Sequence, residues 1–364
     1  MTSNINPFDV PELVEYCVDF LHDSRPDLEA CALVSRAWVY ASQYHIFSTT
    51  SWESMLNQHQ QISRISEISA LPHILALISR LEINVYYLGQ SDSFSGVISW
   101  LTRLKAVRIS GNSVPSTPQI ALVAIRALIG LPTVECVELY CSFESPAAFI
   151  QIWDGCSENI RHLFLGNIRV KDSEYDWVSS PALKFRRKLA LDSLYISYGN
   201  FVTPWLVTDA CPFDFSHLTT LSVCEHVHIL RWRVFSRAQL TLKRFRIWLS
   251  EPPTLSLDIL DLGPFKQLQH LTIIARSVTS LRMAIIVLSS LPTDSRLTSL
   301  EIECVSRRET LSHLDDLLFG MPLSELQKVN ISIEPRWPTT LEEAESWLPN
   351  LFAREVLTVR FLDK

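Results

Sequence analysis

A short apolar phrase that recurs at near-even spacing is the feature that most constrains the fold of this 364-residue chain. The phrase has apolar residues at its first, fourth and sixth positions, as in Ile160-x-x-Leu163-x-Leu165. These residues occupy the fourth, middle apolar position of the eleven copies: Leu81, Val107, Val137, Leu163, Leu194, Leu221, Phe245, Leu271, Leu300, Val329 and Val359. Successive middle residues are 24 to 31 residues apart. Such regularity indicates an internal repeat rather than chance in a leucine-rich chain.

The phrase and the segments between its copies predict a strand followed by a helix. Alternate residues of an extended chain point to one side, so the last two apolar positions of each phrase would face the interior of a stacked array. Apolar residues recur at helical spacing in the stretches 118–129, 280–291 and 309–319, as expected for helices that cover such an array. The sequence therefore predicts an α/β fold built from stacked repeats.

Period and pattern resemble leucine-rich repeats, whose turns are roughly 20–29 residues long. The resemblance implies a solenoid of about eleven repeats, with parallel strands on the concave face and helices on the convex face. The family's Asn, three residues after the last apolar position, occurs only at Asn112. The ladder of Asn side chains that joins successive turns is therefore largely missing, and irregular curvature is expected.

The N-terminal residues 5–47 do not carry the repeat phrase. An amphipathic stretch predicts a helix from about 10 to 21, with Pro11 in its first turn, where a missing N–H is tolerated. Apolar residues at helical spacing predict a second helix over 28–34, and Trp38 continues its apolar face. These residues by themselves predict a small helical bundle.

The order of residues in this bundle resembles an F-box. The stretch reads Val10-Pro11-Glu12-Leu13, then Phe20-Leu21, then Asp27-Leu28-x-x-Cys31-Ala32-Leu33-Val34-Ser35-Arg36-x-Trp38. The family pattern is Leu-Pro-x-Glu-Leu, an apolar helix, and Asp-Leu-x-x-Cys-x-Leu-Val-x-Arg-x-Trp. Val10 replaces the usual Leu, and Tyr16-Cys17-Val18 stands where two large aliphatic residues are common.

F-box proteins with degenerate leucine-rich repeats, including those of fungi, are substrate receptors of Skp–cullin–F-box ubiquitin ligases. The resemblance implies a role in ubiquitin-dependent protein degradation, with an F-box-like module at 1–48, a connection at 49–74 and the solenoid at 75–364. The residues that it assigns to contact with the Skp-type adaptor are Val10, Pro11, Leu13, Leu28, Cys31, Val34 and Trp38. An alternative interpretation is a non-ligase interaction scaffold, in which the helical module only caps the end of the solenoid.

A second candidate surface follows from strand parity. Residues that flank the inward apolar positions would project from the concave sheet, and aromatic residues and Arg are enriched in interface hot spots. The residues that we expect to contact an unknown target protein are Tyr140, Phe164, Tyr195, Arg244, Arg246 and Trp248. Their chemistry predicts a target segment with acidic and apolar character. The alternative is that the aromatic rings only cover the sheet.

Sequence motifs for catalysis are not found. There is no phosphate-binding glycine loop, zinc-protease helix or nucleophile elbow, and the chain contains only 9 Gly. Cys224, His226 and His228 alternate along the chain and could share one side of a strand, but no second Cys/His cluster lies nearby, which favours ordinary surface residues over a metal site. The sequence therefore predicts a protein that is not an enzyme and that has no cofactor and no metal site.

Charge and hydropathy restrict the partners. The net charge of -7 disfavours nucleic acid and anionic membrane surfaces, which require a positive field. No secretory signal or apolar stretch of transmembrane length is found. The eight cysteines include no C-x-x-C pair, which is typical of reduced thiols. We therefore expect a cytoplasmic or nuclear protein that binds other proteins.

Overall fold

The computed structural model describes residues 10–52, 67–68, 70–88, 94–111, 117–170, 188–197, 205–206, 208, 211–224, 236–249, 260–305, 308–321, 323, 325–334 and 340–361. The chain divides into two compact units, Met1–Ile160 and Arg161–Lys364. This division lies inside the predicted solenoid, and the predicted boundaries at 48 and 74 remain predictions. Among the residues described, no helix combines the length and the apolar character needed to cross a membrane.

The first unit begins with three helices, which are α1 (Pro11–Asp19), α2 (Arg25–Val34) and α3 (Arg36–Ser48). Pro11 lies in the first turn of α1, as predicted. Ser35 is extended and separates α2 from α3, so Trp38 lies on a third helix and does not continue the second. Helix α3 packs against both α1 and α2, which gives the small bundle its own core.

Among the described residues of the first unit, four parallel strands follow, in the order β1 (Thr49–Trp52), β2 (Arg80–Asn84), β3 (Ala106–Ser110) and β4 (Cys136–Tyr140). The unit also contains α5 (Pro72–Leu75), α6 (Val85–Leu88), α7 (Phe94–Ile98), α8 (Gln119–Ile129), β5 (Ser142–Phe143) and α9 (Pro146–Gln151). Strand β1 lies before the first predicted copy of the phrase, and its Trp52 pairs with Ile83. The apolar phrase does not identify this repeat, because Thr50 occupies the position of the middle apolar residue.

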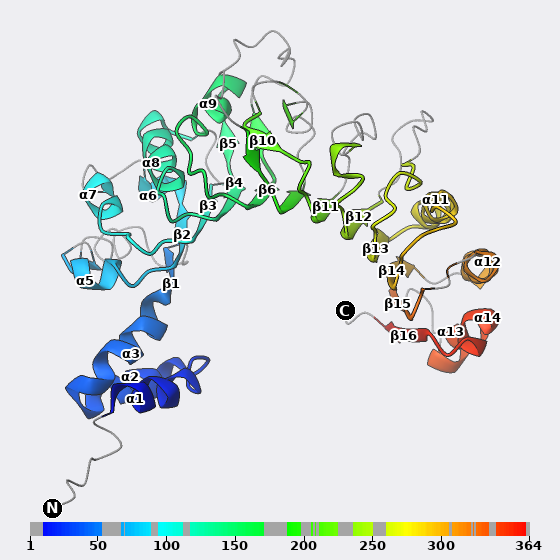
Figure 1. Ribbon diagram of the computed structural model, residues 1–364, viewed down its shortest axis with the longest axis horizontal. Coiled ribbons are helices and arrows are strands. Elements are labelled where there is room, and N and C mark those ends of the chain that lie inside the picture. The colour runs from blue at the N-terminus through cyan, green and yellow to red at the C-terminus, as the bar shows by residue number, and fades with distance from the viewer. Residues whose placement is uncertain are drawn as a thin grey trace, which may run out of the picture. The chain divides into compact units, whose positions relative to one another are not determined.

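The second unit contains eight parallel strands among its described residues: β6 (His162–Gly166), β9 (Ser193–Ser197), β11 (Thr220–Cys224), β12 (Arg244–Trp248), β13 (His270–Ala275), β14 (Ser299–Val305), β15 (Lys328–Glu334) and β16 (Leu357–Phe361). Its other elements are β7 (Arg169–Val170), β8 (Leu189–Ala190), β10 (Phe213–Asp214), α11 (Val278–Ser289), α12 (Arg308–Gly320), α13 (Leu341–Ser346) and α14 (Pro349–Ala353). Helices α11, α12 and α14 lie along one side of strands β13 to β16 (Figure 1). The predicted mixed α/β fold with parallel repeat strands is confirmed.

The register of the strands confirms the repeat phrase in detail. In the second unit, Leu163 pairs with Leu194, and the pairing continues through the predicted middle residues as far as Val329. The last copy is wrong by two residues, because Val329 pairs with Leu357 and not with Val359. Strand β15 has a third buried inward position, Ile333, and this register places Phe361 opposite it.

Backbone hydrogen bonds join the repeats where an Asn ladder is missing. In eight of the described repeats, the residue two positions before the middle residue accepts two backbone N–H groups of the next repeat through its carbonyl. These carbonyls belong to Ser79, Lys105, Arg161, Asp192, Thr219, Lys243, Gln269 and Thr298. The N···O distances are 2.8–3.2 Å. Backbone groups inside a stacked array must be paired, and this pairing needs no particular side chain. Asn112 lies outside the described residues.

Candidate protein-interaction surfaces

The exposed face of α1 and α2 carries large apolar side chains. Leu13 is 47% exposed and Val34 is 68% exposed. Tyr16 on α1 and Phe20, the residue that follows α1, are also exposed, and their rings contact edge to face with centroids 4.9 Å apart. Leu33 adds a further exposed side chain at the end of α2. A module of this size does not need these side chains for its own core, so they form a candidate docking surface.

Two of the residues assigned to the adaptor surface belong instead to the inside of the module. Leu28 is only 2% exposed and forms the core with Val14, Val18 and Ala41. Trp38 is partly buried against this core. The prediction that Leu28 lies on a docking surface is therefore wrong, because Leu28 packs against Val14 and Val18 of α1 and Ala41 of α3. Of the other predicted residues, Pro11 is exposed, whereas Val10 and Cys31 are partly buried.

The outward side of strands β2 to β4 carries a compact ion-pair network. Glu138 is only 7% exposed. Its carboxylate lies 2.6 Å from the Arg80 guanidinium and 4.0 Å from that of Arg108. Arg80 also lies 3.4 Å from the carboxylate of Glu82. The guanidinium of Arg108 stacks over the Tyr140 ring, 4.9 Å from its centroid. Tyr140 projects outward, as predicted, but it is already covered by an arginine.

A cysteine beside this network has a perturbed pKa. Burial raises the pKa of the Cys136 thiol to about 11, the carboxylate of Glu138 adds to the rise, and Arg80 opposes it. The thiol is therefore protonated at neutral pH, and a protonated thiol is a poor nucleophile and a poor metal ligand. The site has the chemistry of a structural contact and not of a reactive cysteine.

The strand face of the second unit begins with an aromatic pair. The rings of Phe164 and Tyr195 stack with their centroids 4.1 Å apart and their planes within 3°. Both side chains are only partly buried, whereas Leu163, Leu165 and Leu194 beside them are in the core. The predicted parity of these strands is therefore correct.

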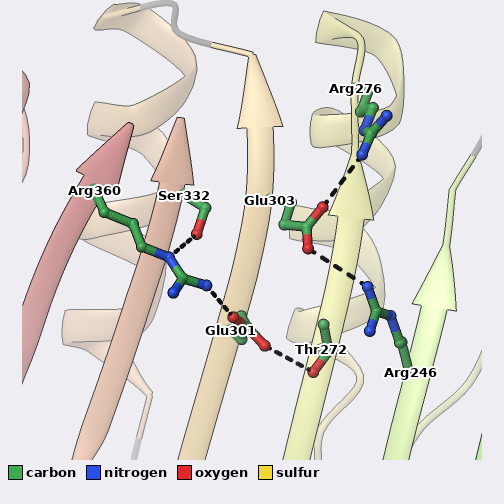
Figure 2. Close-up of polar contacts among 7 residues, drawn as sticks. All are labelled: Arg246, Thr272, Arg276, Glu301, Glu303, Ser332 and Arg360. Carbon is green, nitrogen blue, oxygen red and sulfur yellow. Dashed lines mark hydrogen bonds and ion pairs between the residues drawn. The ribbon is translucent and has the colours of Figure 1, made fainter. Parts of the chain in front are cut away.

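Arginines and glutamates dominate the other end of this face, on β12 to β16 (Figure 2). The carboxylate of Glu303 lies 3.5 Å from the guanidinium of Arg246 and 3.6 Å from that of Arg276. Arg276 also stacks over the Trp248 ring, 4.7 Å from its centroid. Arg246 and Trp248 are not buried, which again agrees with the predicted parity. Arg246, however, already has a carboxylate partner within the chain.

A second part of the same network surrounds Glu301. Its carboxylate lies 2.7 Å from the guanidinium of Arg360 and accepts a 3.4 Å hydrogen bond from the hydroxyl of Thr272. Arg360 also donates to the hydroxyl of Ser332 at 2.7 Å. Three guanidinium groups thus surround the two glutamates of strand β14 (Figure 2). Arg360 and both glutamates alternate with inward apolar residues along their strands, so the sequence pattern could have placed them on the outward face. Arg276 comes after the end of β13, and the pattern does not place it.

The network leaves cations more exposed than anions. The side chain of Arg246 is 54% exposed, whereas that of Glu303 is 14% exposed. Arg244 is exposed too, with its Nε donating to the Thr220 hydroxyl at 3.1 Å. The outward charges along β12 to β16 are those of Arg244, Arg246, Arg276, Lys328 and Arg360 against Glu301, Glu303 and Glu334. Among the described residues, this face therefore carries more basic than acidic side chains, although the whole chain is negative.

The structure offers no support for a metal site in the residues that it describes, where no group of three His, Cys, Asp or Glu side chains could hold an ion. Cys224 is partly buried at the end of β11. His226 and His228 lie outside the described residues, so the alternating cluster remains a sequence observation.

No protein-family model and no curated protein sequence matches this chain. Among solved structures, the chain is similar to the leucine-rich repeat-containing protein LegL7 from Legionella pneumophila, with 13% sequence identity and a TM-score of 0.38. The match covers 87% of this chain and 91% of that chain. The repeat architecture is established by the strand ladder of this chain itself and not by that likeness.

Proposed function

We propose that this chain is a non-enzymatic substrate receptor of a Skp–cullin–F-box ubiquitin ligase. In this proposal, α1 to α3 dock on the Skp-type adaptor and the repeat strands bind a target protein. The observation that carries it is that the helical module has its own core, which includes Val14 and Leu28, while the large apolar side chains of Leu13 and Val34 remain exposed. The ordered resemblance of residues 10–38 to an F-box supports the identity of the partner.

The adaptor contact can be tested with a charge on the exposed surface. Leu13 lies in the first turn of α1, where a carboxylate is compatible with the helix dipole, so Leu13→Asp should leave the module folded. A buried unpaired charge at an interface is costly, and we expect affinity for a purified Skp-type adaptor to fall at least about ten-fold, or 1.4 kcal/mol. Isothermal titration of both proteins measures this.

Ile120→Asp is the matched control. Ile120 is also in the first turn of a helix, α8, and is 56% exposed, but it lies outside the proposed contact. This variant should bind the adaptor like the wild type. The ligase proposal is abandoned if the wild-type chain does not bind the adaptor, or if Leu13→Asp binds it equally well.

A second candidate function is a scaffold in which the helical module only caps the repeats. Helix α3 runs directly into β1, and the backbone N–H and the hydroxyl of Ser79 both donate to the Ser48 carbonyl, at 2.9 and 3.0 Å. These contacts favour a capping role. In that case, removal of residues 1–48 should destabilise strands β1 to β3, and Leu13→Asp should change no partner affinity.

A further inference from the structure

We propose that the strand face of the second unit binds an extended segment of a partner protein in which an acidic side chain follows a large apolar one by three residues. The apolar side chain would contact Phe164 and Tyr195, and the carboxylate would pair with Arg244 and Arg246. This inference rests on the proposed function only in taking the ligand to be a protein, and it requires no adaptor.

The aromatic pair supplies the apolar end of this site. Phe164 and Tyr195 lie side by side on β6 and β9, and each ring restrains the other through their stacking contact. Rigid aromatic side chains lose little conformational entropy on binding and provide a large contact area. Their partly exposed rings therefore suit one large apolar side chain.

The spacing follows from the strand register. Tyr195 pairs with Ser222, and Ser222 pairs with Arg246, so the three side chains stand in one row across β9, β11 and β12. Two steps between neighbouring strands span about 10 Å. A polyproline II segment advances about 9 Å in each turn of three residues, so its side chains i and i+3 face the same surface. The small side chain of Ser222 leaves room for such a segment to cross.

The part of the site that would bind the carboxylate is basic because of Arg246 and its surroundings. Glu303 contacts one end of the Arg246 guanidinium at 3.5 Å, while more than half of the arginine side chain is exposed. A guanidinium has five N–H donors, so Arg246 can pair with a second carboxylate without releasing Glu303. Arg244 lies two residues earlier on the same side of β12 and is also exposed. The excess of basic side chains on this face attracts an acidic segment and repels a basic one.

A panel of fluorescein-labelled peptides tests the proposal on the full-length chain. Each peptide has about twelve residues with a Pro- and Ser-rich sequence that favours polyproline II, and carries one Leu. One peptide has two Asp residues at i+3 and i+4 from the Leu, a second has two Lys residues there, and a third has the Asp pair at i+7 and i+8. Fluorescence anisotropy measures binding up to about 1 mM peptide, the weak end of specific recognition.

We expect the Asp peptide with the short spacing to bind most tightly and the Lys peptide not to bind. Arg246→Ala and Phe164→Ala should each weaken that binding at least about ten-fold, as for hot-spot residues. Arg282→Ala is the control, because Arg282 is an exposed arginine on α11, outside the strand face, and it should bind like the wild type. The proposal is overturned if no peptide binds, if the Lys or long-spaced peptide binds as well as the short-spaced Asp peptide, or if Arg246→Ala has no effect.

Because this experiment contains no adaptor, its outcome is separate from that of the ligase proposal. Loss of peptide recognition with intact adaptor binding would remove only this site. Peptide binding by a chain that does not bind the adaptor would retain the site and support an interaction scaffold.

Discussion

The strand faces of the two units are built on the same repeat phrase but use arginine differently. In the first unit, Glu138 is buried between Arg80 and Arg108, and its carboxylate organises the network. In the second, Glu303 lies 3.5 and 3.6 Å from Arg246 and Arg276, compared with 2.6 Å between Glu138 and Arg80, and Arg246 and Arg276 are 54% and 49% exposed, against 40% and 37% for Arg80 and Arg108. The repeat determines which residues point inward and leaves the outward positions free. One face can therefore serve stability while the other remains available to a partner.

The largest expected difference is in stability. Arg80→Ala would leave the buried Glu138 with only the more distant Arg108, and because Arg80 itself is partly exposed, the loss of this partner should cost about 2 kcal/mol. Arg246→Ala should cost less than about 1 kcal/mol, because exposed pairs contribute little. Urea denaturation of both variants measures the difference, and hydrogen exchange at β2 to β4 would locate the loss for Arg80→Ala. Equal costs would remove the distinction between the two faces.

Salt should separate the proposed peptide contact from the adaptor contact. Raising the salt concentration from about 0.05 to 0.3 M shortens the screening length from roughly 14 to 6 Å, and affinity for the Asp peptide should fall several-fold. Adaptor binding through Leu13 and Val34 should change little, because that surface is apolar. Titrations at both salt concentrations compare the two contacts. An affinity for the Asp peptide that does not change with salt would contradict a cationic face.

The smallest expected effect is a change in the reactivity of Cys136, on the strand face of the first unit. Glu138→Gln removes a carboxylate that raises the pKa of Cys136, so that pKa should fall toward its ordinary value. More thiolate would then be present at pH 8, and thiolate is the reactive form. Alkylation of Cys136 by iodoacetamide, followed by mass spectrometry, should become a few-fold faster.

Cys156 provides an internal control for that measurement. Burial raises the pKa of its thiol to about 11 as well, but Glu138 is not among the causes. Its alkylation rate should be the same in the Glu138→Gln variant and the wild type. A parallel increase at both cysteines would indicate general loosening of the unit and not a local electrostatic effect.

The inward positions could be predicted from the sequence because a two-residue alternation places them without further information. Strand β1 could not be predicted, because Thr50 occupies the position of the middle apolar residue. The register between β15 and β16 could not be predicted either, because it depends on the additional pairing of Phe361 with Ile333. In the helical module, a family motif indicates which residues recur but not whether they face the core or a partner. Leu28 is the example, because its burial depends on the positions of both α1 and α3.

On the strand face, parity predicted that Arg246 and Trp248 project outward, and they do. It could not predict that Arg276 stacks on Trp248 and contacts Glu303, because these contacts join residues from different repeats. Sequence periodicity describes each turn separately, whereas the properties of a surface depend on neighbours about 30 residues away, one repeat period. The candidate site was therefore located by sequence, but its charge balance required the structure.

The carbonyl ladder between the repeats has a consequence for how this sequence can change by mutation. Its acceptors belong to residues as different as Ser79, Asp192 and Lys243, and the bonds use only main-chain atoms. Nearly every amino acid provides the same N–H and C=O groups, and proline alone lacks the donor. A single nucleotide change at these positions therefore rarely removes a link between turns. Such a fold can lose its recognisable signature through accumulated substitutions while the geometry of the stack persists.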